Sequence, residues 1–195
     1  MVKVAFQGEQ GAYSEIAALK YFNDRVINKA RSSVHLVACY SFQDVFQKIQ
    51  NGECEYGIIP IENSSYGSVF DTYDLLQQYH FKIIGELNLQ ITHHLLGLKK
   101  IPFNKIKKIY SHPQALGQCS KFIKTLKNIK IIPTYDTAGS AKILIENKEE
   151  DVAIIASRES ARIYNLKILK SAIQNNKENY TRFLIINKKQ TKTKF

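Results

Sequence analysis

The chain has 195 residues and a formal net charge of +11, with 44% hydrophobic and 23% charged residues. This composition is typical of a soluble globular protein, and the length allows one domain or two small lobes. No apolar run approaches the roughly 18 residues of a membrane span, and no apolar signal segment follows Lys3, so we expect a cytoplasmic protein without a membrane partner. The lysines are scattered and form no basic-aromatic stripe or known nucleic-acid motif. We therefore expect the charge to attract anionic small molecules rather than nucleic acid.

Apolar periodicity predicts alternating strands and helices in the first half of the chain. Ser41 and Asp44 are spaced as at a helix start, and the helix that follows is expected to end at Asn51-Gly52. The long alternating segment 81–98 is long enough to cross between two lobes. The expected strands here are 2–6, 34–39 and 56–61, and the expected helices are 14–22, 42–49 and 70–79.

A second series of strands and helices follows. Pro113 lies in the first turn of an expected helix, where proline is favoured, and Asp136 and Ser157 are expected to cap two more. The polar stretch 174–180 predicts a loop, and the basic tail 188–194 is expected to be loose. The expected strands are 106–110, 130–133, 151–156 and 181–187, and the expected helices are 113–126, 137–145 and 158–164.

Strands that alternate with helices predict an α/β fold in which mostly parallel sheets are flanked by helices. We expect two lobes with two crossings, because the series changes near residues 80–95 and a late strand can lead back. The first lobe is expected to hold about 1–85 plus 187–195, and the second about 86–186. A cleft between the lobes is the default place for a ligand.

The stretch 56–69 is the most informative part of the sequence. Its first half is a short apolar, β-branched run, typical of a buried strand, and its second half is a polar turn with glycine. Glu62, Asn63 and Ser64 therefore leave the carboxyl end of a buried strand, where ligands bind in open α/β sheets. Ser64 is equally suited to cap the next helix.

The sequence predicts no metal site. Cys39, Cys54 and Cys119 form no CxxC pair, so the pattern favours buried reduced thiols over a disulfide framework or a zinc site. His93 and His94 are neighbours on an alternating segment, so at most one of them faces a cleft. No set of carboxylates accompanies them to complete a metal site.

Four motifs in the right order carry a resemblance that covers nearly the whole chain. The motifs are VAFQGEQGAYSE at 4–15, PIENS at 60–64 with GSV at 67–69, SHPQAL at 111–116 with QC at 118–119, and NYTRF at 179–183. Together they resemble the prephenate dehydratase family and its close relatives, the arogenate dehydratases. The residues 136–138 and 153–157 fit the same family.

The resemblance implies a two-lobed α/β fold like a periplasmic binding protein of type II, with the active site between the lobes. It implies a homodimeric carbon–oxygen lyase of phenylalanine biosynthesis that acts on prephenate and needs no metal or redox cofactor. Members of the family usually carry a C-terminal ACT domain that binds phenylalanine. The sequence ends at Phe195, about where that domain would begin, so we expect no ACT domain in it. A naturally short protein and a trimmed one both fit this ending.

The family's reaction removes a ring carboxylate as carbon dioxide and a ring hydroxyl as water, and it therefore needs a donor at the departing hydroxyl. By resemblance, Thr181 is the first choice for this donor; the alternative is a β-branched residue that merely starts a strand. Arg182 is a candidate carboxylate clamp or an ion-paired structural residue, because neighbouring strand residues point to opposite faces. Phe183 shares the Thr181 face. Glu62 is a candidate proton source or orienting group.

Further candidates for substrate binding come from the amide and hydroxyl groups near helix starts. Asn63 is expected to bind the substrate or take part in catalysis. Ser111, at a strand end beside a helix N-terminus, suits a carboxylate, and Gln114 and Gln118 share its helix side. Thr137 is a donor or only a helix cap. His112 fits a turn histidine better than an acid or base.

Two other functions compete with prephenate dehydration. An arogenate dehydratase would give phenylalanine directly, and no residue plainly distinguishes the two substrates, which differ in a keto or amino group. A two-lobed binder of an anionic small molecule would need no turnover. Thr181 together with Glu62 and Asn63 favours an enzyme, because a pure carboxylate binder has no use for a donor at a leaving group.

Overall fold

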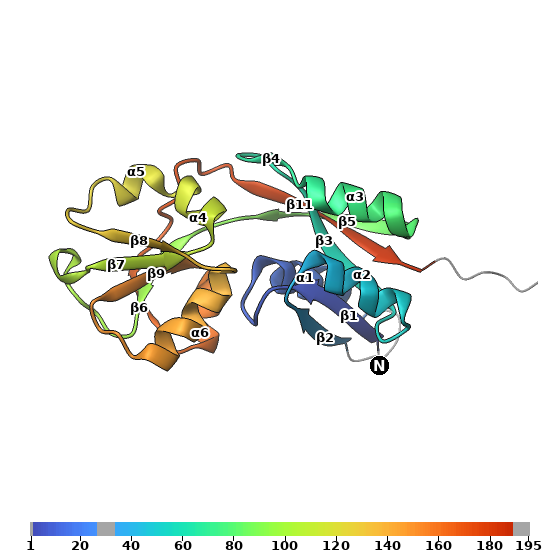
Figure 1. Ribbon diagram of the computed structural model, residues 1–195, viewed down its shortest axis with the longest axis horizontal. Helices are drawn as coiled ribbons and strands as arrows, with labels where there is room; N and C mark the ends of the chain where they lie inside the picture. The colour runs from blue at the N-terminus through green and yellow to red at the C-terminus, as the bar shows by residue number, and fades with distance from the viewer. Residues whose placement is uncertain (1, 27–33, 189–195) are drawn as a thin grey trace, which may run out of the picture.

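The protein folds into two α/β lobes that lie side by side (Figure 1). The computed structural model describes residues 2–26 and 34–188. Each lobe has one sheet with helices packed on both of its faces. The expected α/β class and the two-lobed arrangement are therefore confirmed.

The first sheet combines a parallel core with antiparallel additions. Its strands are β1 (Val2–Gln7), β2 (Val34–Cys39), β3 (Tyr56–Asn63), β4 (Gly67–Ser68), β5 (Lys82–Gln90) and β11 (Tyr180–Asn187). Their order is β2-β1-β3-β11-β5, with β4 paired to β3. β1 pairs parallel with β2 and β3, whereas β11 runs antiparallel between β3 and β5. The last strand of the chain thus lies within the first sheet and not at its edge.

Three helices cover the two faces of this sheet, and the alternation along β11 shows which side is which. Phe183 and Ile185 pack towards α1 (Tyr13–Val26), and Leu184 and Ile186 pack towards α2 (Phe42–Gln50) and α3 (Phe70–Tyr79). This two-residue period places apolar side chains on both faces, as a buried strand requires. Ser41 and Asp44 form the capping box that their spacing predicted at the start of α2.

The second sheet follows the same plan. Its strands are β6 (His94–Gly97), β7 (Lys108–Ser111), β8 (Lys130–Pro133), β9 (Val152–Ala156) and β10 (Lys167–Lys170). The order is β10-β6-β9-β7-β8, in which β9, β7 and β8 are parallel and β6 and β10 are added antiparallel. The carboxyl ends of the parallel strands β7 and β9 lead into helix starts, which is where side chains of a site are expected to gather.

The helices of the second lobe also lie on two faces. One face is covered by α4 (Pro113–Gln118) and α5 (Ser120–Ile123), and the other by α6 (Thr137–Asn147) and α7 (Arg158–Ile163). A short 3₁₀ helix, η1 (Phe103–Lys105), precedes β7. The expected single helix over 113–126 is divided at Cys119, whose backbone leaves the helical region with φ −109° and ψ 12°.

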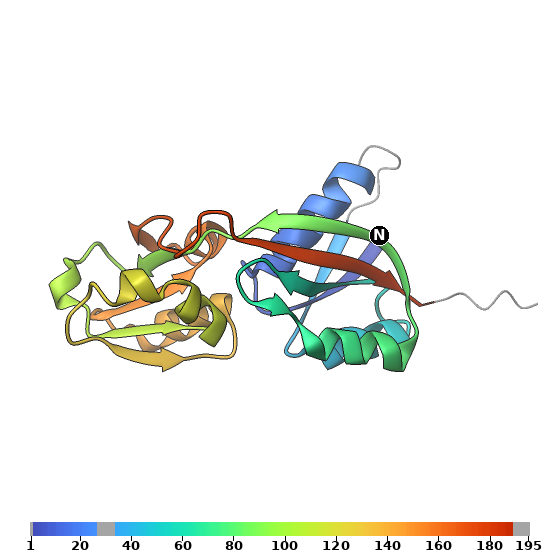
Figure 2. The same ribbon diagram turned by 90° about the horizontal axis from the view of Figure 1, so that it is seen from above.

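The lobe boundaries differ from those expected. The sequence predicted changes of lobe near residues 86 and 186, but β5 and β11 belong over their whole length to the first sheet. The chain crosses after β5 ends at Gln90 and returns before β11 begins at Tyr180 (Figure 2). The apolar alternation over 81–98 runs through both sheets, so it does not show where the pairing partner changes. Of the expected tail, residues 189–195 lie outside the described part of the chain.

No helix in the described ranges is long and apolar enough to cross a membrane. Within the same ranges, no group of three or more His, Cys, Asp or Glu side chains is placed to hold a metal ion. Cys39, Cys54 and Cys119 are all buried free thiols, as their spacing predicted.

Candidate active site

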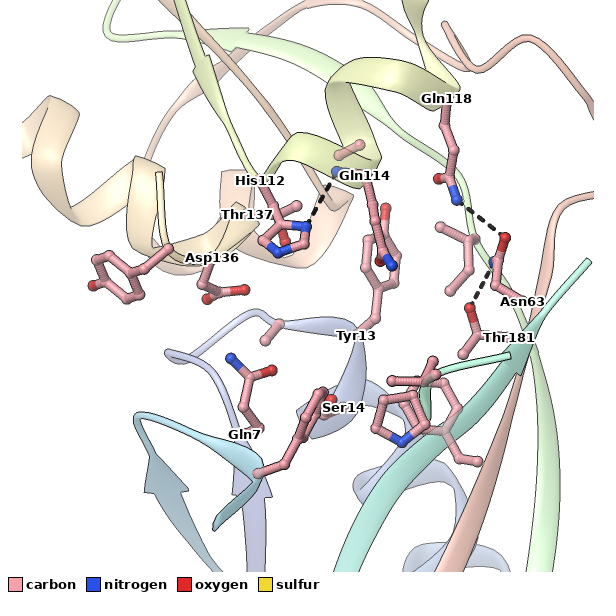
Figure 3. Close-up of a pocket in the computed structure, with 18 of the residues that line it drawn as sticks. Gln7, Tyr13, Ser14, Asn63, His112, Gln114, Gln118, Asp136, Thr137 and Thr181 are labelled. Atoms are coloured by element: carbon pink, nitrogen blue, oxygen red, sulfur yellow. Dashed lines mark hydrogen bonds between the residues drawn. The ribbon is translucent and has the colours of Figure 1, made fainter. Parts of the chain in front are cut away.

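A pocket of about 290 Å³ lies between the two lobes and receives side chains from both (Figure 3). The first lobe contributes residues of strands, of the start of α1 and of loops, among them Gln7, Tyr13, Asn63, Thr181 and Phe183. The second lobe contributes residues from both ends of α4 and from the start of α6. Among the described residues that line it, in the ranges 2–26 and 34–188, there is no lysine or arginine. A ligand in this pocket would therefore meet amides, hydroxyls, aromatic rings and carboxyl groups.

Thr181 and Asn63 line one end of the pocket (Figure 3). They are paired in the antiparallel ladder between β3 and β11, and the Nδ2 atom of Asn63 lies 2.9 Å from Oγ1 of Thr181. Only 9% of Thr181 and 7% of Asn63 are exposed. Phe183, on the same face of β11, lies below them and is 2% exposed.

The orientation of the Asn63 amide is fixed by two backbone groups. The backbone N–H of Ser65 donates to Oδ1 of Asn63 over 2.9 Å, and Nδ2 of Asn63 donates to the carbonyl oxygen of Tyr180 over 3.1 Å. A backbone N–H only donates and a carbonyl only accepts, so the assignment of the two amide atoms is not arbitrary. Nδ2 can only donate, so its two hydrogens are shared among Thr181, Tyr180 and Asn179, and the Thr181 hydroxyl keeps its own proton for another acceptor.

Two further amides join Asn63 in a closed group across the lobes. Nε2 of Gln118, at the end of α4, donates to Oδ1 of Asn63 over 3.1 Å (Figure 3). Nδ2 of Asn179 donates to Oε1 of Gln118 over 3.0 Å, and Oδ1 of Asn179 accepts from Nδ2 of Asn63 over 3.0 Å. Each amide uses both its donor and its acceptor, as buried amides require. The three together hold α4 of the second lobe against β3 of the first.

The opposite end of the pocket is built on two helix starts (Figure 3). Asp136 caps α6: its Oδ2 accepts from the backbone N–H of Gly139 over 3.1 Å and, across the lobes, from that of Glu9 over 3.0 Å. Burial raises the pKa of the Asp136 carboxyl, against the effect of these donors. Thr137 follows it and lines the pocket. This end of the pocket thus carries a carboxyl group that also joins the two lobes.

His112 caps α4, since its Nδ1 accepts from the backbone N–H of Gln114 over 3.3 Å. Burial lowers the pKa of His112, and its ring lines the pocket beside Gln114. This placement fits the turn histidine that the sequence favoured. His93 also lines the pocket, whereas His94 belongs to β6 and pairs with Ala156 in the second sheet.

Six of the ten residues predicted from the sequence line the pocket. They are Asn63, Gln114, Gln118, Thr137, Thr181 and Phe183. They come from three of the four motifs and from the start of α6, so segments far apart in the chain do meet in one place, as expected.

The other four are not among the lining residues. Glu62 is exposed and pairs with Arg182 in the β3–β11 ladder. Its side chain lies on the face of the sheet opposite to that of Asn63, which is called the outer face below. A register shift in this ladder leaves Ile61 unpaired between Pro60 and Glu62, which is typical of a β-bulge. Arg182 is exposed and ion-paired with Glu86. The strand alternation that separated Thr181 from Arg182 is thus confirmed, and neither charged side chain reaches the pocket.

Ser64 and Ser111 have structural partners instead. The Ser64 hydroxyl accepts from the backbone N–H of Tyr180 over 2.9 Å and donates to the carbonyl of Glu178 over 3.1 Å. Ser111 is fully buried, and its hydroxyl donates to the carbonyl of Ile155 over 2.6 Å, joining β7 to β9. The end of β7 lies beside the site, but the side chain of Ser111 points into the sheet.

Sequence reasoning missed several residues of the site. Asn179 is part of the NYTRF motif, but no role was predicted for it from the sequence. Tyr13, His93 and Asp136 were not predicted to line the pocket. Asp136 had a signal, since a helix-capping carboxylate in an α/β fold lies at the ligand-binding edge. The contacts of Asn179 and His93 depend on how the two crossings sit between the lobes, which periodicity does not reveal.

The fold and the interlobe pocket define a class, the two-lobed α/β proteins with a pocket between their lobes. A periplasmic substrate-binding protein of an ABC transporter from Coxiella burnetii has a TM-score of 0.54 with this chain at 13% identity, over 96% of this chain and 84% of that one. At that identity the likeness concerns the fold alone.

Closer comparisons identify the family. The sequence matches the family model for prephenate dehydratase over residues 4–191. It is 43% identical to a prephenate dehydratase of Methanocaldococcus jannaschii over 92% of this chain and 62% of that protein. It is 39% identical to a bifunctional chorismate mutase/prephenate dehydratase of Buchnera aphidicola over 97% of this chain and 48% of that protein. The chain thus spans about half to three-fifths of the length of these curated relatives.

A solved relative shares the same architecture. A prephenate dehydratase from Arthrobacter aurescens, in complex with L-Phe, has a TM-score of 0.83 and 27% identity, covering 96% of this chain and 60% of that one. The chain belongs to the prephenate dehydratase family, as its motifs predicted.

Proposed function

We propose that this chain catalyses the decarboxylating dehydration of prephenate to phenylpyruvate. The observation that carries the proposal is the hydroxyl of Thr181, which accepts from Asn63 and keeps its proton free at the pocket. A pocket that only holds a ligand has no need of a donor oriented in this way. The cavity, about 290 Å³, is at the small end of ligand pockets and suits a single substituted ring.

The reaction gives Thr181 a defined task. The bond between the ring and its carboxylate breaks, and the electron pair forms a ring double bond as carbon dioxide leaves. The ring C–O bond breaks at the same time, and its oxygen leaves as water after it takes up one proton. Hydroxide is a poor leaving group, so a donor placed at that oxygen lowers the barrier. Thr181 supplies this hydrogen bond, and the proton consumed overall comes from solvent.

The described part of the pocket lining has no lysine or arginine, which also suits this chemistry. A carboxylate that is about to leave as neutral carbon dioxide loses any interaction that favours its charge, and only interactions stronger in the transition state accelerate the reaction. Neutral donors such as the amides of Gln114 and Gln118 and the hydroxyl of Thr137 bind a carboxylate less strongly than an arginine would. The ring would pack against Phe183.

The test is incubation of the purified chain with prephenate, with phenylpyruvate measured by its absorbance in alkali. We expect turnover well above the spontaneous loss, and a parallel assay with arogenate measures the preference between the two substrates. A rate equal to the spontaneous loss on both substrates would refute the proposal and leave a binding function. By its family we also propose a cytoplasmic homodimer with no nucleic-acid or membrane partner. Sedimentation of the purified protein tests the dimeric state.

A further inference from the structure

A buried histidine lines the pocket next to the amide of Gln118. His93, in the crossing between β5 and β6, is 2% exposed, and its Nε2 lies 2.6 Å from Oε1 of Gln118. Its other ring nitrogen, Nδ1, lies 3.2 Å from the hydroxyl oxygen of Tyr13, which belongs to the first turn of α1. The two rings meet edge to face with centroids 5.4 Å apart. His93 is thus held between one residue of each lobe.

The fixed amide of Asn63 determines which nitrogen of His93 carries the proton. Oδ1 of Asn63 is held by the backbone N–H of Ser65, so the atom of Gln118 that faces it must be the donor Nε2. The other amide atom of Gln118, which faces His93, is then the acceptor Oε1. An acceptor at 2.6 Å requires a donor, so Nε2 of His93 bears the hydrogen.

Tyr13 is compatible with this assignment. A neutral imidazole with a proton on Nε2 has a lone pair on Nδ1. The single hydroxyl proton of Tyr13 is donated to the carbonyl of Thr92 over 2.7 Å and can be shared with that lone pair over 3.2 Å. Burial lowers the pKa of His93 to about 4, so the ring is neutral near neutral pH. Burial also raises the pKa of Tyr13 well above its usual value, which keeps its hydroxyl protonated. A neutral His93 and a protonated Tyr13 are both compatible with these contacts.

We propose that His93, oriented by Tyr13, is a positioning residue for the dehydration: its Nε2–H fixes the amide of Gln118, which in turn holds Asn63 and, through it, the hydroxyl of Thr181. This inference rests on the proposed function. A Gln118 amide turned over would place Oε1 against Oδ1 of Asn63, two acceptors in contact, and would break the group that joins the lobes. His93 itself need not touch the substrate to have this effect.

The kinetic test uses two variants of His93 and one of its neighbour. His93→Leu removes the donor, and His93→Gln restores an N–H that can reach Gln118. His94→Gln is the matched control, because His94 is similarly buried, at 4% exposed, but lies in the second sheet. We expect His93→Leu to lower kcat about tenfold to a hundredfold, the effect of one lost buried hydrogen bond, with KM within about twofold.

The conservative variants distinguish positioning from packing. His93→Gln should recover most of kcat, and His94→Gln should keep it near the wild-type value, with thermal melting measured for all three. A kcat for His93→Leu within about twofold of wild type would overturn the inference, and so would a His93→Gln enzyme as slow as His93→Leu. In either case, prephenate turnover by the wild type would still uphold the proposed function. A wild type inactive on prephenate would refute the proposed function and the positioning role together.

Nitrogen-15 NMR of the wild-type protein tests the arrangement without substrate or variants. The imidazole shifts of His93 should show a neutral ring with the proton on Nε2. A neutral ring with the proton on Nδ1 would contradict the orientation of Gln118 and overturn the inference, even if every His93 variant failed to fold.

Discussion

Asn63 donates its amide hydrogen to Thr181 across the β3–β11 ladder, over 2.9 Å, and not the reverse. The direction follows from the backbone groups of Ser65 and Tyr180, which fix the two ends of the Asn63 amide. It has a chemical consequence, because a hydroxyl that already accepts one hydrogen bond can direct its own proton to the pocket. A threonine is a weak acid, so what the site provides is an oriented donor, held in place before the substrate arrives.

The first prediction concerns this donor. Thr181→Ala should lower kcat for prephenate at least about a hundredfold, the usual size of a lost acid–base interaction. Stability should change by no more than about 1 kcal/mol, because Nδ2 of Asn63 keeps its acceptors on Asn179 and Tyr180. Thr181→Ser, which keeps the hydroxyl, is the control and should retain most of the rate. Steady-state kinetics check this, and a kcat for Thr181→Ala within about threefold of wild type would reject the role.

The second prediction concerns the charged neighbours of Asn63 and Thr181. Glu62→Gln and Arg182→Gln should each keep kcat and KM within about twofold of wild type, because both side chains lie on the outer face of the ladder. The Arg182–Glu86 pair is exposed and screened by solvent, so its loss should also affect stability little. A large fall in kcat for Glu62→Gln would show that this carboxylate reaches the substrate in a state with a different strand register.

Much of this arrangement could be predicted from the sequence, because the α/β class, the two lobes and most strands depend on local periodicity. Strand alternation also separated Thr181 from Arg182 correctly. The candidates Glu62, Ser64 and Ser111 lie outside the pocket for physical reasons that periodicity does not carry. Ser111 and Ser64 satisfy nearby backbone groups, which compete for any hydroxyl at a strand end. Glu62 follows the bulge at Ile61 onto the outer face.

The lobe boundaries show the same limit. Residues 86–90 and 180–186 belong to the first sheet because β11 pairs with both β3 and β5. Pairing between distant strands leaves no trace in the apolar pattern of either strand alone. The roles of His93 and Asn179 depend on those crossings too, so they could be found only once the two lobes were placed together.

The third prediction concerns ionic strength. The chain carries a net charge of +11, while none of the pocket-lining residues that the structure describes is a lysine or arginine, so the attraction of a dianion acts from a distance. Such attraction is screened by salt. Raising ionic strength from about 0.01 M to about 0.5 M should therefore raise KM for prephenate and leave kcat unchanged. A KM that stays flat over this range would show that the surface charge plays no part in substrate capture.

The fourth prediction concerns stability in acid. Burial lowers the pKa of His93 to about 4 in the folded protein, whereas an unfolded histidine has a pKa of about 6.5. Between these values the unfolded chain binds a proton that the folded protein does not, so the free energy of unfolding falls as the pH is lowered. His93→Gln lacks this titration. The stability of the wild type relative to His93→Gln should therefore fall by roughly 2 kcal/mol from about pH 7 to about pH 4.5.

Denaturant unfolding of both proteins across this pH range measures the difference. Burial lowers the pKa values of His94 and His112 and raises those of Glu15 and Asp136. His112, Glu15 and Asp136 titrate in both proteins and do not contribute to the pKa of His93, so their contributions cancel in the comparison, whereas the contribution of His94, which interacts with His93, cancels only in part. A stability difference that does not change with pH would mean that His93 keeps an ordinary pKa, and hence that water reaches its ring and competes for the contact with Gln118.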